Sequence, residues 1–127
     1  MKNPVVLCVD DEPNVLEALY RELRKDGYNI LLAGSAEEAL EVMKSNRVDV
    51  IVSDELMPGM GGNSLLQWIK EDYPGTTRIM LTGHYNESEV TLGAINRAEV
   101  FRLLPKPWGE DELRDAVREA VTTGSAR

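Results

Sequence analysis

The chain has 127 residues, of which 43% are hydrophobic, so its length and composition predict one domain with a buried core and exclude a disordered tail. Its net charge of −8 argues against direct nucleic-acid binding, because a phosphate backbone requires a basic protein surface. No apolar run approaches the length of a membrane span. The single cysteine, Cys8, lies within an apolar run, which favours a reducing, cytoplasmic setting.

Apolar runs rich in Val and Ile alternate with segments of helical periodicity from the N-terminus onward. The first run, residues 5–9, predicts a buried strand. Pro13 suits the first turn of the helix that follows, and Gly27 is a plausible end to that helix. Residues 30–33 predict a second strand, and Ser35 then opens a helix, with a glutamate three residues later in the capping-box position.

The second half of the chain repeats this alternation. A strand at residues 48–53 leads into a glycine-rich loop and a helix that ends near Tyr73. Further strands are expected at 79–81 and 100–104, with a short helix at 86–95 between them. A last helix follows, with an apolar stripe formed by Leu113, Ala116, Val117, Ala120 and Val121. Five strands alternating with five helices predict an α/β fold with a parallel sheet.

Polar residues stand at the ends of four of these strands. Because ligands of parallel α/β sheets bind beyond the carboxyl ends of the strands, these residues are expected to converge at one edge. Carboxylates beside a lysine and a hydroxyl suit a divalent cation and a phosphoryl group. Each residue alone has an ordinary explanation as a helix cap, a loop carboxylate or a solvated lysine, and their joint placement argues against it. The residues are Asp10, Asp11, Asp54, Thr82 and Lys106.

Four motifs, at residues 9–13, 54–62, 81–83 and 106–108, resemble those of receiver domains of two-component response regulators. The resemblance covers nearly the whole chain. It implies a flavodoxin-like, doubly wound sheet of strand order 2-1-3-4-5, a receiver domain over residues 1–122, and a C-terminal tail or linker start at 123–127. It also implies a signalling module that catalyses only its own phosphorylation and dephosphorylation.

The resemblance assigns a role to each strand-end residue. Asp54 is expected to accept a phosphoryl group from a histidine kinase or a phosphotransfer protein. Thr82 is expected to follow that group, and Lys106 to balance its charge. The output is expected on the face made by the fourth helix, the fifth strand and the fifth helix. The Mg²⁺ ligands are expected to be Asp10, Asp11, Asp54 and the backbone carbonyl of Leu56.

The chain departs from the receiver pattern near the end of the sheet. Leu103 stands where many receivers carry an aromatic switch residue, and Phe101 lies two residues earlier, where strand alternation places it on the same face. Leu56 and His84 flank the expected phosphorylation site and are candidates for setting the phosphoryl lifetime, although an exposed loop is the ordinary setting for His84. Residues 94–102 resemble a receiver subgroup joined to HD-type cyclic dinucleotide phosphodiesterases or to kinases.

Three other functions fit parts of the pattern. A Mg²⁺-dependent aspartyl-phosphate phosphohydrolase would carry a second acid two residues after its nucleophile, where this chain has Leu56. A flavin-binding module would need a hydroxyl-rich first loop, whereas Asp10 and Asp11 would repel the phosphate. A receiver-like interaction module that needs no phosphorylation is disfavoured by the intact acidic set but stays open.

Overall fold

The protein forms a five-stranded parallel sheet flanked by helices in a computed structural model that describes residues 3–83 and 98–125. The strands are β1 (Val5–Val9), β2 (Asn29–Ala33), β3 (Val50–Asp54), β4 (Thr77–Thr82) and β5 (Arg102–Pro105). The helices are α1 (Pro13–Leu23), a 3₁₀ turn (Arg24–Asp26), α2 (Ala36–Ser45), α3 (Gly62–Asp72) and α5 (Glu112–Ser125). The strand order β2-β1-β3-β4-β5 confirms the predicted fold.

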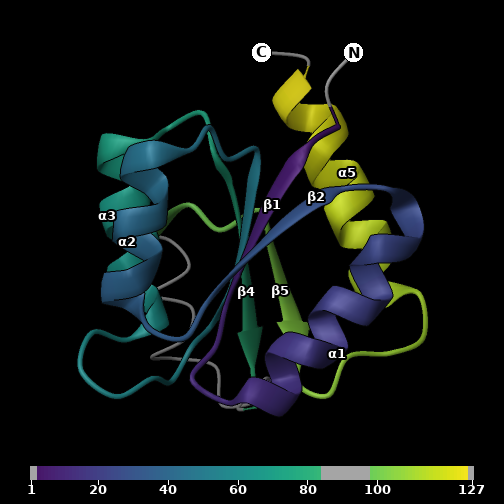
Figure 1. Cartoon of the computed structure of the whole chain (residues 1–127), viewed down its shortest axis with the longest axis horizontal. Coiled ribbons are helices and arrows are strands. Elements are labelled where there is room, and N and C mark those ends of the chain that lie inside the picture. The colour runs from purple at the N-terminus through teal and green to yellow at the C-terminus, as the bar shows by residue number, and fades with distance from the viewer. Residues whose placement is uncertain (1–2, 84–97, 126–127) are drawn as a thin grey trace.

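The helices cover both faces of the sheet, so the described residues form two hydrophobic cores. Helices α2 and α3 lie on one face, and α1 and α5 lie on the other (Figure 1). The core beneath α2 and α3 contains Leu7, Ile51, Leu65 and Met80, and the core beneath α1 and α5 contains Val6, Val52, Ile79, Leu81 and Val117. Burial on both faces explains why the central strands read as continuous apolar runs rather than as alternating patterns.

Local sequence signals set several helix ends. Pro13 occupies the first turn of α1, where its missing N–H costs no hydrogen bond. Gly27 ends the following 3₁₀ turn with a left-handed φ of 79°, a conformation that favours glycine. The Ser35 hydroxyl accepts a hydrogen bond of 3.1 Å from the Glu38 backbone N–H and so caps α2. These three positions confirm the predictions made from the sequence.

Other boundaries differ from the predicted ones by a few residues. Strand β3 begins and ends later than predicted, and α5 continues to Ser125, whereas a C-terminal tail or linker start was predicted from residue 123. The domain boundary at residue 122 stays a prediction. The helix expected at 86–95 and His84 lie outside the described residues.

The prediction that Phe101 and Leu103 share a face of the sheet is wrong. Phe101 packs against the core beneath α1 and α5, whereas Leu103 packs against the core on the opposite face. Strand β5 begins only at Arg102, and the chain bends into it after Glu99, which has a positive φ of 49°. Because Phe101 precedes the regular strand, strand alternation does not extend to it.

An ion pair joins the end of the first helical region to α5. Arg114 donates from Nε and Nη2 to the two carboxylate oxygens of Asp26, at 3.0 and 2.8 Å. This hydrogen bonding, opposed by partial burial and reinforced by the arginine charge, lowers the pKa of Asp26 below its ordinary value. The pair therefore favours the folded state wherever Asp26 is ionised.

Candidate functional site

Backbone hydrogen bonds continue past the ends of the strands and fix the residues that follow them. Such bonds hold functional side chains on rigid elements rather than on free loops. They align the ends of neighbouring strands at one edge of the sheet. The bonds run from Asp10 N to Ala33 O (3.2 Å), from Glu55 N to Leu81 O (2.9 Å) and from Lys106 N to Thr82 O (2.9 Å).

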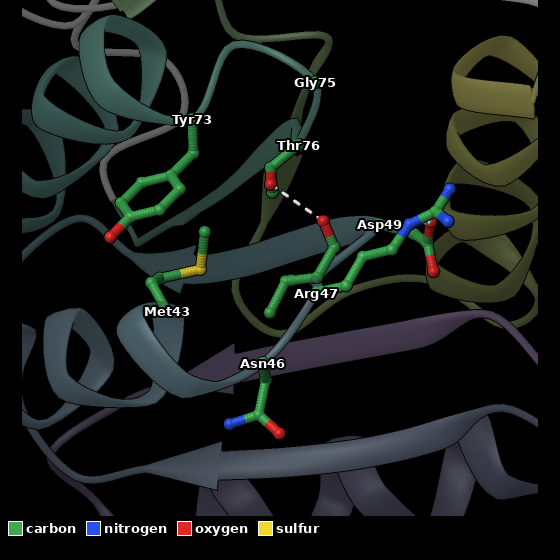
Figure 2. Close-up of a pocket in the computed structure, with 8 residues that line it drawn as sticks. Met43, Asn46, Arg47, Asp49, Tyr73, Gly75 and Thr76 are labelled. Atoms are coloured by element: carbon green, nitrogen blue, oxygen red, sulfur yellow. Dashed lines mark hydrogen bonds and ion pairs between the residues drawn. The ribbon is translucent and has the colours of Figure 1, made fainter.

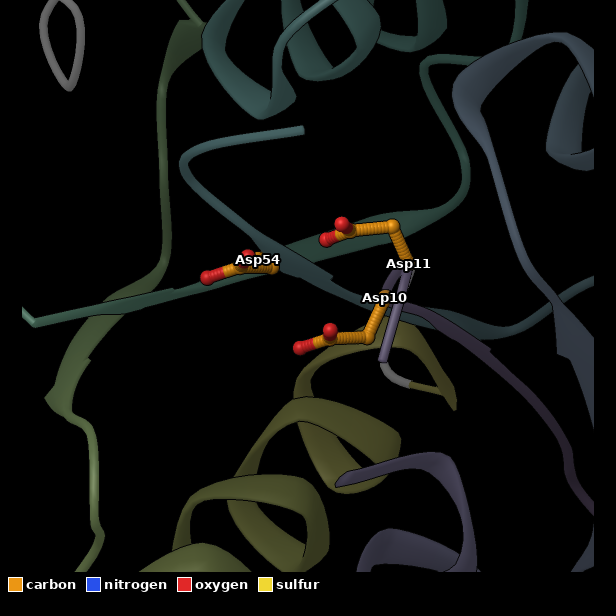
Figure 3. A group of neighbouring side chains, drawn as sticks. All are labelled: Asp10, Asp11 and Asp54. Carbon is orange, nitrogen blue, oxygen red and sulfur yellow. The ribbon is translucent and has the colours of Figure 1, made fainter. Parts of the chain in front are cut away.

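Three aspartates converge at this edge, from two strands that are far apart in the sequence. Asp10 and Asp11 follow β1, Asp54 ends β3, and their carboxylates gather in one group (Figure 3). One oxygen from each lies within 4.8 Å of the others. Asp10 and Asp54 are buried, and Asp11 is exposed. Such a set of hard oxygen donors could hold a divalent cation.

Lys106 inserts its ammonium group between two of the carboxylates. Its Nζ lies 3.0 Å from Asp10 Oδ2 and 3.3 Å from Asp54 Oδ1. Burial alone would lower the pKa of Lys106, but the hydrogen bond to Asp10 and the charges of Asp54 and Asp10 raise it above the ordinary lysine value. The ammonium is therefore charged at neutral pH. The other oxygen of Asp10, Oδ1, accepts a hydrogen bond of 2.9 Å from Glu12 N.

The pKa of the Asp54 carboxyl lies well above that of an ordinary aspartate. Burial is the main cause, the negative charge of Asp10 adds to it, Lys106 opposes it, and Asp11 adds a smaller contribution. Together these effects raise the pKa of Asp54 to about 6. The carboxylate is thus mainly ionised at neutral pH, but it is less stabilised by its surroundings than it would be in water. A buried, destabilised carboxylate is suited to act as a nucleophile.

Glu55 lies beside the site, although the sequence pattern did not single it out. The Glu55 side chain is buried, and its Oε1 accepts a hydrogen bond from the hydroxyl of Thr82, which is fully buried. The signal was an acid directly after the strand-end aspartate, at the end of an otherwise apolar strand. Leu56, which follows Glu55, is 60% exposed.

Helix α3 packs tightly against the end of β3. A Cβ atom added at Gly62 would lie 1.9 Å from the backbone oxygen of Asp54, closer than any real contact. The Gly62 N–H also donates to the backbone oxygen of Glu55 at 2.9 Å. The absence of a side chain at Gly62 therefore lets the first turn of α3 support the backbone beside Asp54.

A second hollow, of about 330 Å³, lies away from the acidic cluster, between α2, α3 and the start of β3 (Figure 2). The polar groups drawn there serve the fold. The Thr76 hydroxyl donates to the backbone oxygen of Val48 at 2.7 Å, and the exposed Arg47 pairs with Asp49 at 3.7 Å. No charged group is buried among its lining residues, so the acidic edge is the better candidate site.

Comparison with known proteins agrees with this geometry. The family model described as "Response regulator receiver domain" matches residues 6–118. The chain belongs to the response regulator receiver family. It is a receiver domain of two-component signalling, a signalling module rather than an enzyme. Membership implies interaction with a histidine kinase and with output partners.

Curated relatives are longer than this receiver domain. The hydrogenase transcriptional regulatory protein HoxA of Cupriavidus necator is 38% identical over 120 residues, which are 94% of this chain and 24% of that protein. The transcriptional regulatory protein YvrH of Bacillus subtilis is 38% identical over 119 residues, 93% of this chain and 49% of that protein. The chain therefore spans about a quarter of the first relative and about half of the second.

Solved receiver structures superpose on almost the whole chain. The signal receiver domain of an HD domain-containing protein from Pseudomonas fluorescens has a TM-score of 0.94 and 36% identity, covering 99% of this chain and 100% of that one. The response regulator TrrA from Thermotoga maritima, in complex with Mg²⁺ and BeF, has a TM-score of 0.80 and 32% identity, covering 94% and 99%. Family membership sets aside the phosphohydrolase and flavin alternatives. None of the described helices is long and apolar enough to span a membrane.

The raised pKa of Asp54 predicts that Asp54→Asn stabilises the protein in metal-free buffer. The unfolded carboxyl titrates near 3.8, so folding becomes less favourable as the pH rises from there through about 6. Near neutral pH and above, in EDTA, we expect the variant to gain about 1–3 kcal/mol in the free energy of unfolding. Urea unfolding as a function of pH measures this gain, which should vanish at about pH 3.5.

Asp26→Asn is the matched control, with the opposite sign. The pKa of Asp26 is lowered in the folded state, so its contribution to stability is fully present above pH 3.8 and is lost as the pH falls through the folded-state value. This variant should be less stable than the wild type at neutral pH and should converge with it in acid. An Asp54→Asn variant less stable than the wild type at neutral pH would contradict the assigned environment of Asp54.

Proposed function

We propose that Asp54 is the phosphoacceptor and that Mg²⁺ assists the transfer. The observation that carries this proposal is the position of the Asp54 carboxylate, beside Lys106 and within 4.8 Å of the oxygens of two further aspartates. A carboxylate oxygen of Asp54 forms a bond to phosphorus as the bond from phosphorus to the donor's imidazole nitrogen breaks. The electron pair stays with the imidazole, which takes up a proton from solvent. The donor is a phosphohistidine of a histidine kinase or phosphotransfer protein.

The acidic cluster fits Mg²⁺ on the chemistry of its donors. Mg²⁺ prefers oxygen ligands, usually one or two carboxylates together with water and phosphate oxygens, and it would supply charge neutralisation to the incoming phosphoryl group. Within the described part of the chain, Asp11 makes no hydrogen bond or ion pair, so its carboxylate is available. We assign Asp11, Asp54, Asp10 and the backbone carbonyl of Leu56 as the residues that hold the ion.

Lys106 and Thr82 complete the proposed mechanism. The Lys106 ammonium contacts Asp54 before transfer and would balance the charge of the phosphoryl group afterwards. The Thr82 hydroxyl lies at the end of the neighbouring strand and would donate to a phosphoryl oxygen. The exposed side chain of Leu56 would hinder water at the mouth of the site and so lengthen the life of the phosphoryl group. A role for His84 in that lifetime stays a prediction.

We propose that the phosphorylated state is read on the surface formed by β5, α5 and the segment that precedes β5. Lys106 follows β5 directly, and its backbone N–H bonds to Thr82, so the site is joined to this surface. Phe101, Arg102, Arg118 and Glu119 border an open hollow there, and Arg102 pairs with Glu119. The net charge of −8 supports a protein partner or output domain rather than nucleic acid.

Acetyl phosphate with Mg²⁺ is expected to add one phosphoryl group to the wild type and none to Asp54→Asn. Intact-mass spectrometry measures the addition, and the loss of the added group at high pH would indicate an acyl phosphate. Asp26→Asn is the control, because it removes an aspartate outside the site. Equal labelling of Asp54→Asn and the wild type would refute the assignment. A wild type that stays unlabelled by this donor and by a phosphorylated kinase would instead favour the phosphorylation-independent module.

Asp11→Ala is expected to weaken Mg²⁺ binding by about tenfold or more, because it removes a charged oxygen ligand. The fold should remain intact, since the side chain is exposed and the change relieves repulsion among the carboxylates. Calorimetric titration with Mg²⁺ measures the affinity. Glu12→Ala is the matched control, because it removes the same charge from the next exposed residue. Similar affinities for the two variants would rule out a ligand role for Asp11.

Beryllofluoride with Mg²⁺, which mimics the phosphoryl group, is expected to shift the backbone amide resonances of β5 and α5. The shifts are expected because the added negative charge attracts the side chains of Lys106 and Thr82. The backbones of these two residues are hydrogen-bonded to each other at the ends of β5 and β4. Heteronuclear NMR spectra with and without the mimic test this, with Asp54→Asn as the control that should not respond. Shifts confined to α1 and α2 would defeat the proposed output surface.

A further inference from the structure

Glu55 is a buried carboxylate whose role neither the acidic cluster nor the fold accounts for. Glu55 is only 7% exposed, and it directly follows Asp54, the proposed phosphoacceptor. The carboxylate does not belong to the cluster of three aspartates, and it accepts a hydrogen bond from the Thr82 hydroxyl through Oε1. Burying a carboxyl group is unfavourable unless it is hydrogen-bonded, so this contact stabilises the side chain where it lies.

The backbone of Glu55 is anchored on both sides. Its N–H donates to the Leu81 oxygen and its oxygen accepts from the Gly62 N–H, both at 2.9 Å. The close approach of Gly62 to the preceding peptide leaves that backbone little room to move. The backbone of Glu55 is therefore held in place, and a rotation of the Thr82 side chain toward Asp54 would act against the hydrogen bond between the two side chains.

A threonine hydroxyl has a single proton to donate. While that proton is directed to Glu55, it cannot also be donated to a phosphoryl oxygen on Asp54. We infer that Glu55 is a positioning residue that retains Thr82 in the unphosphorylated arrangement, so that phosphorylation must compete with a buried, charge-assisted hydrogen bond. This inference rests on the proposed function of Asp54, and it adds a residue that sets how readily the domain switches.

This competition predicts how substitutions at residue 55 change the affinity for the phosphoryl mimic. Without the acceptor at residue 55, the Thr82 hydroxyl no longer donates to that residue, and the affinity for beryllofluoride in the presence of Mg²⁺ should rise. Removal of a hydrogen bond to a charged group corresponds to about a tenfold gain for Glu55→Leu. Glu55→Gln keeps an acceptor oxygen but loses the charge, so its gain should be smaller, about threefold.

A double-mutant cycle separates release of the hydroxyl from the loss of a negative charge near the site. The four proteins are the wild type, Glu55→Leu, Thr82→Val and the double variant, each titrated with beryllofluoride by fluorescence or NMR. If Glu55 acts through Thr82, the gain from Glu55→Leu should fall below about twofold in the Thr82→Val background. Glu37→Leu is a charge control, because it removes an exposed carboxylate near Gly59 in the loop after β3.

A second measurement needs neither metal nor mimic. Side-chain scalar couplings should show one χ1 rotamer for Thr82 in the free wild type and rotamer averaging in Glu55→Leu. Urea unfolding of each variant checks that the fold is retained. Two results would overturn the inference. One is an equal gain in beryllofluoride affinity from Glu55→Leu with and without the Thr82 hydroxyl. The other is an unchanged χ1 rotamer distribution of Thr82 in Glu55→Leu. Failure of the wild type to bind beryllofluoride and to become phosphorylated would refute the proposed function of Asp54 instead, and the couplings would still decide the role of Glu55.

Discussion

The site depends on the placement of one ammonium group between two carboxylates. A parallel sheet gathers the ends of its strands at one edge, and in this chain three of the residues gathered there are aspartates. Like charges in a partly buried space repel, and burial raises the free energy of each ionised group. The Lys106 ammonium offsets this repulsion, because its nitrogen lies 3.0 Å from an Asp10 oxygen and 3.3 Å from an Asp54 oxygen. The ammonium thus reduces the electrostatic cost of gathering these carboxylates at one edge.

The compensation is incomplete, and this is what makes the site reactive. The pKa of Asp54 is raised to about 6 even with Lys106 beside it, because burial and the charge of Asp10 outweigh the ammonium. A carboxylate in such surroundings gains from a further positive charge, such as that of a bound divalent cation. The same imbalance lowers the stability of the folded protein, which is a common cost of functional sites.

The mechanical connections of the site run through the backbone at the ends of β3, β4 and β5. The hydrogen bonds from Glu55 N to Leu81 O and from Lys106 N to Thr82 O join the three strand ends into a continuous ladder. A change in the position of the Thr82 backbone would therefore also displace Lys106 and the end of β5. On this strand Leu103 and Leu104 pack into opposite cores, so a shift of β5 would reach both layers of helices. This arrangement offers a physical route from the acidic edge to the proposed output surface.

The sequence by itself determined the order of the elements and the residues at their ends. Apolar runs followed by Asp10, Asp54 and Thr82 predicted strands that end in polar groups, because buried parallel strands are apolar on both faces. The capping positions at Pro13 and Ser35 were equally readable, because a helix end depends on a few neighbouring residues. The strand order, in contrast, came from the resemblance to receivers, since periodicity carries no information about which strands are neighbours.

Only the tertiary structure decided the partners of each side chain. It placed Phe101 and Leu103 on opposite faces, because the strand starts one residue after Phe101 and alternation holds only within a strand. It also revealed that Glu55 is buried against Thr82, 27 positions away in the sequence. Local sequence patterns report which residues can form a strand or a cap. A hydrogen bond between two strand ends depends on how the sheet is assembled, which is a property of the whole chain.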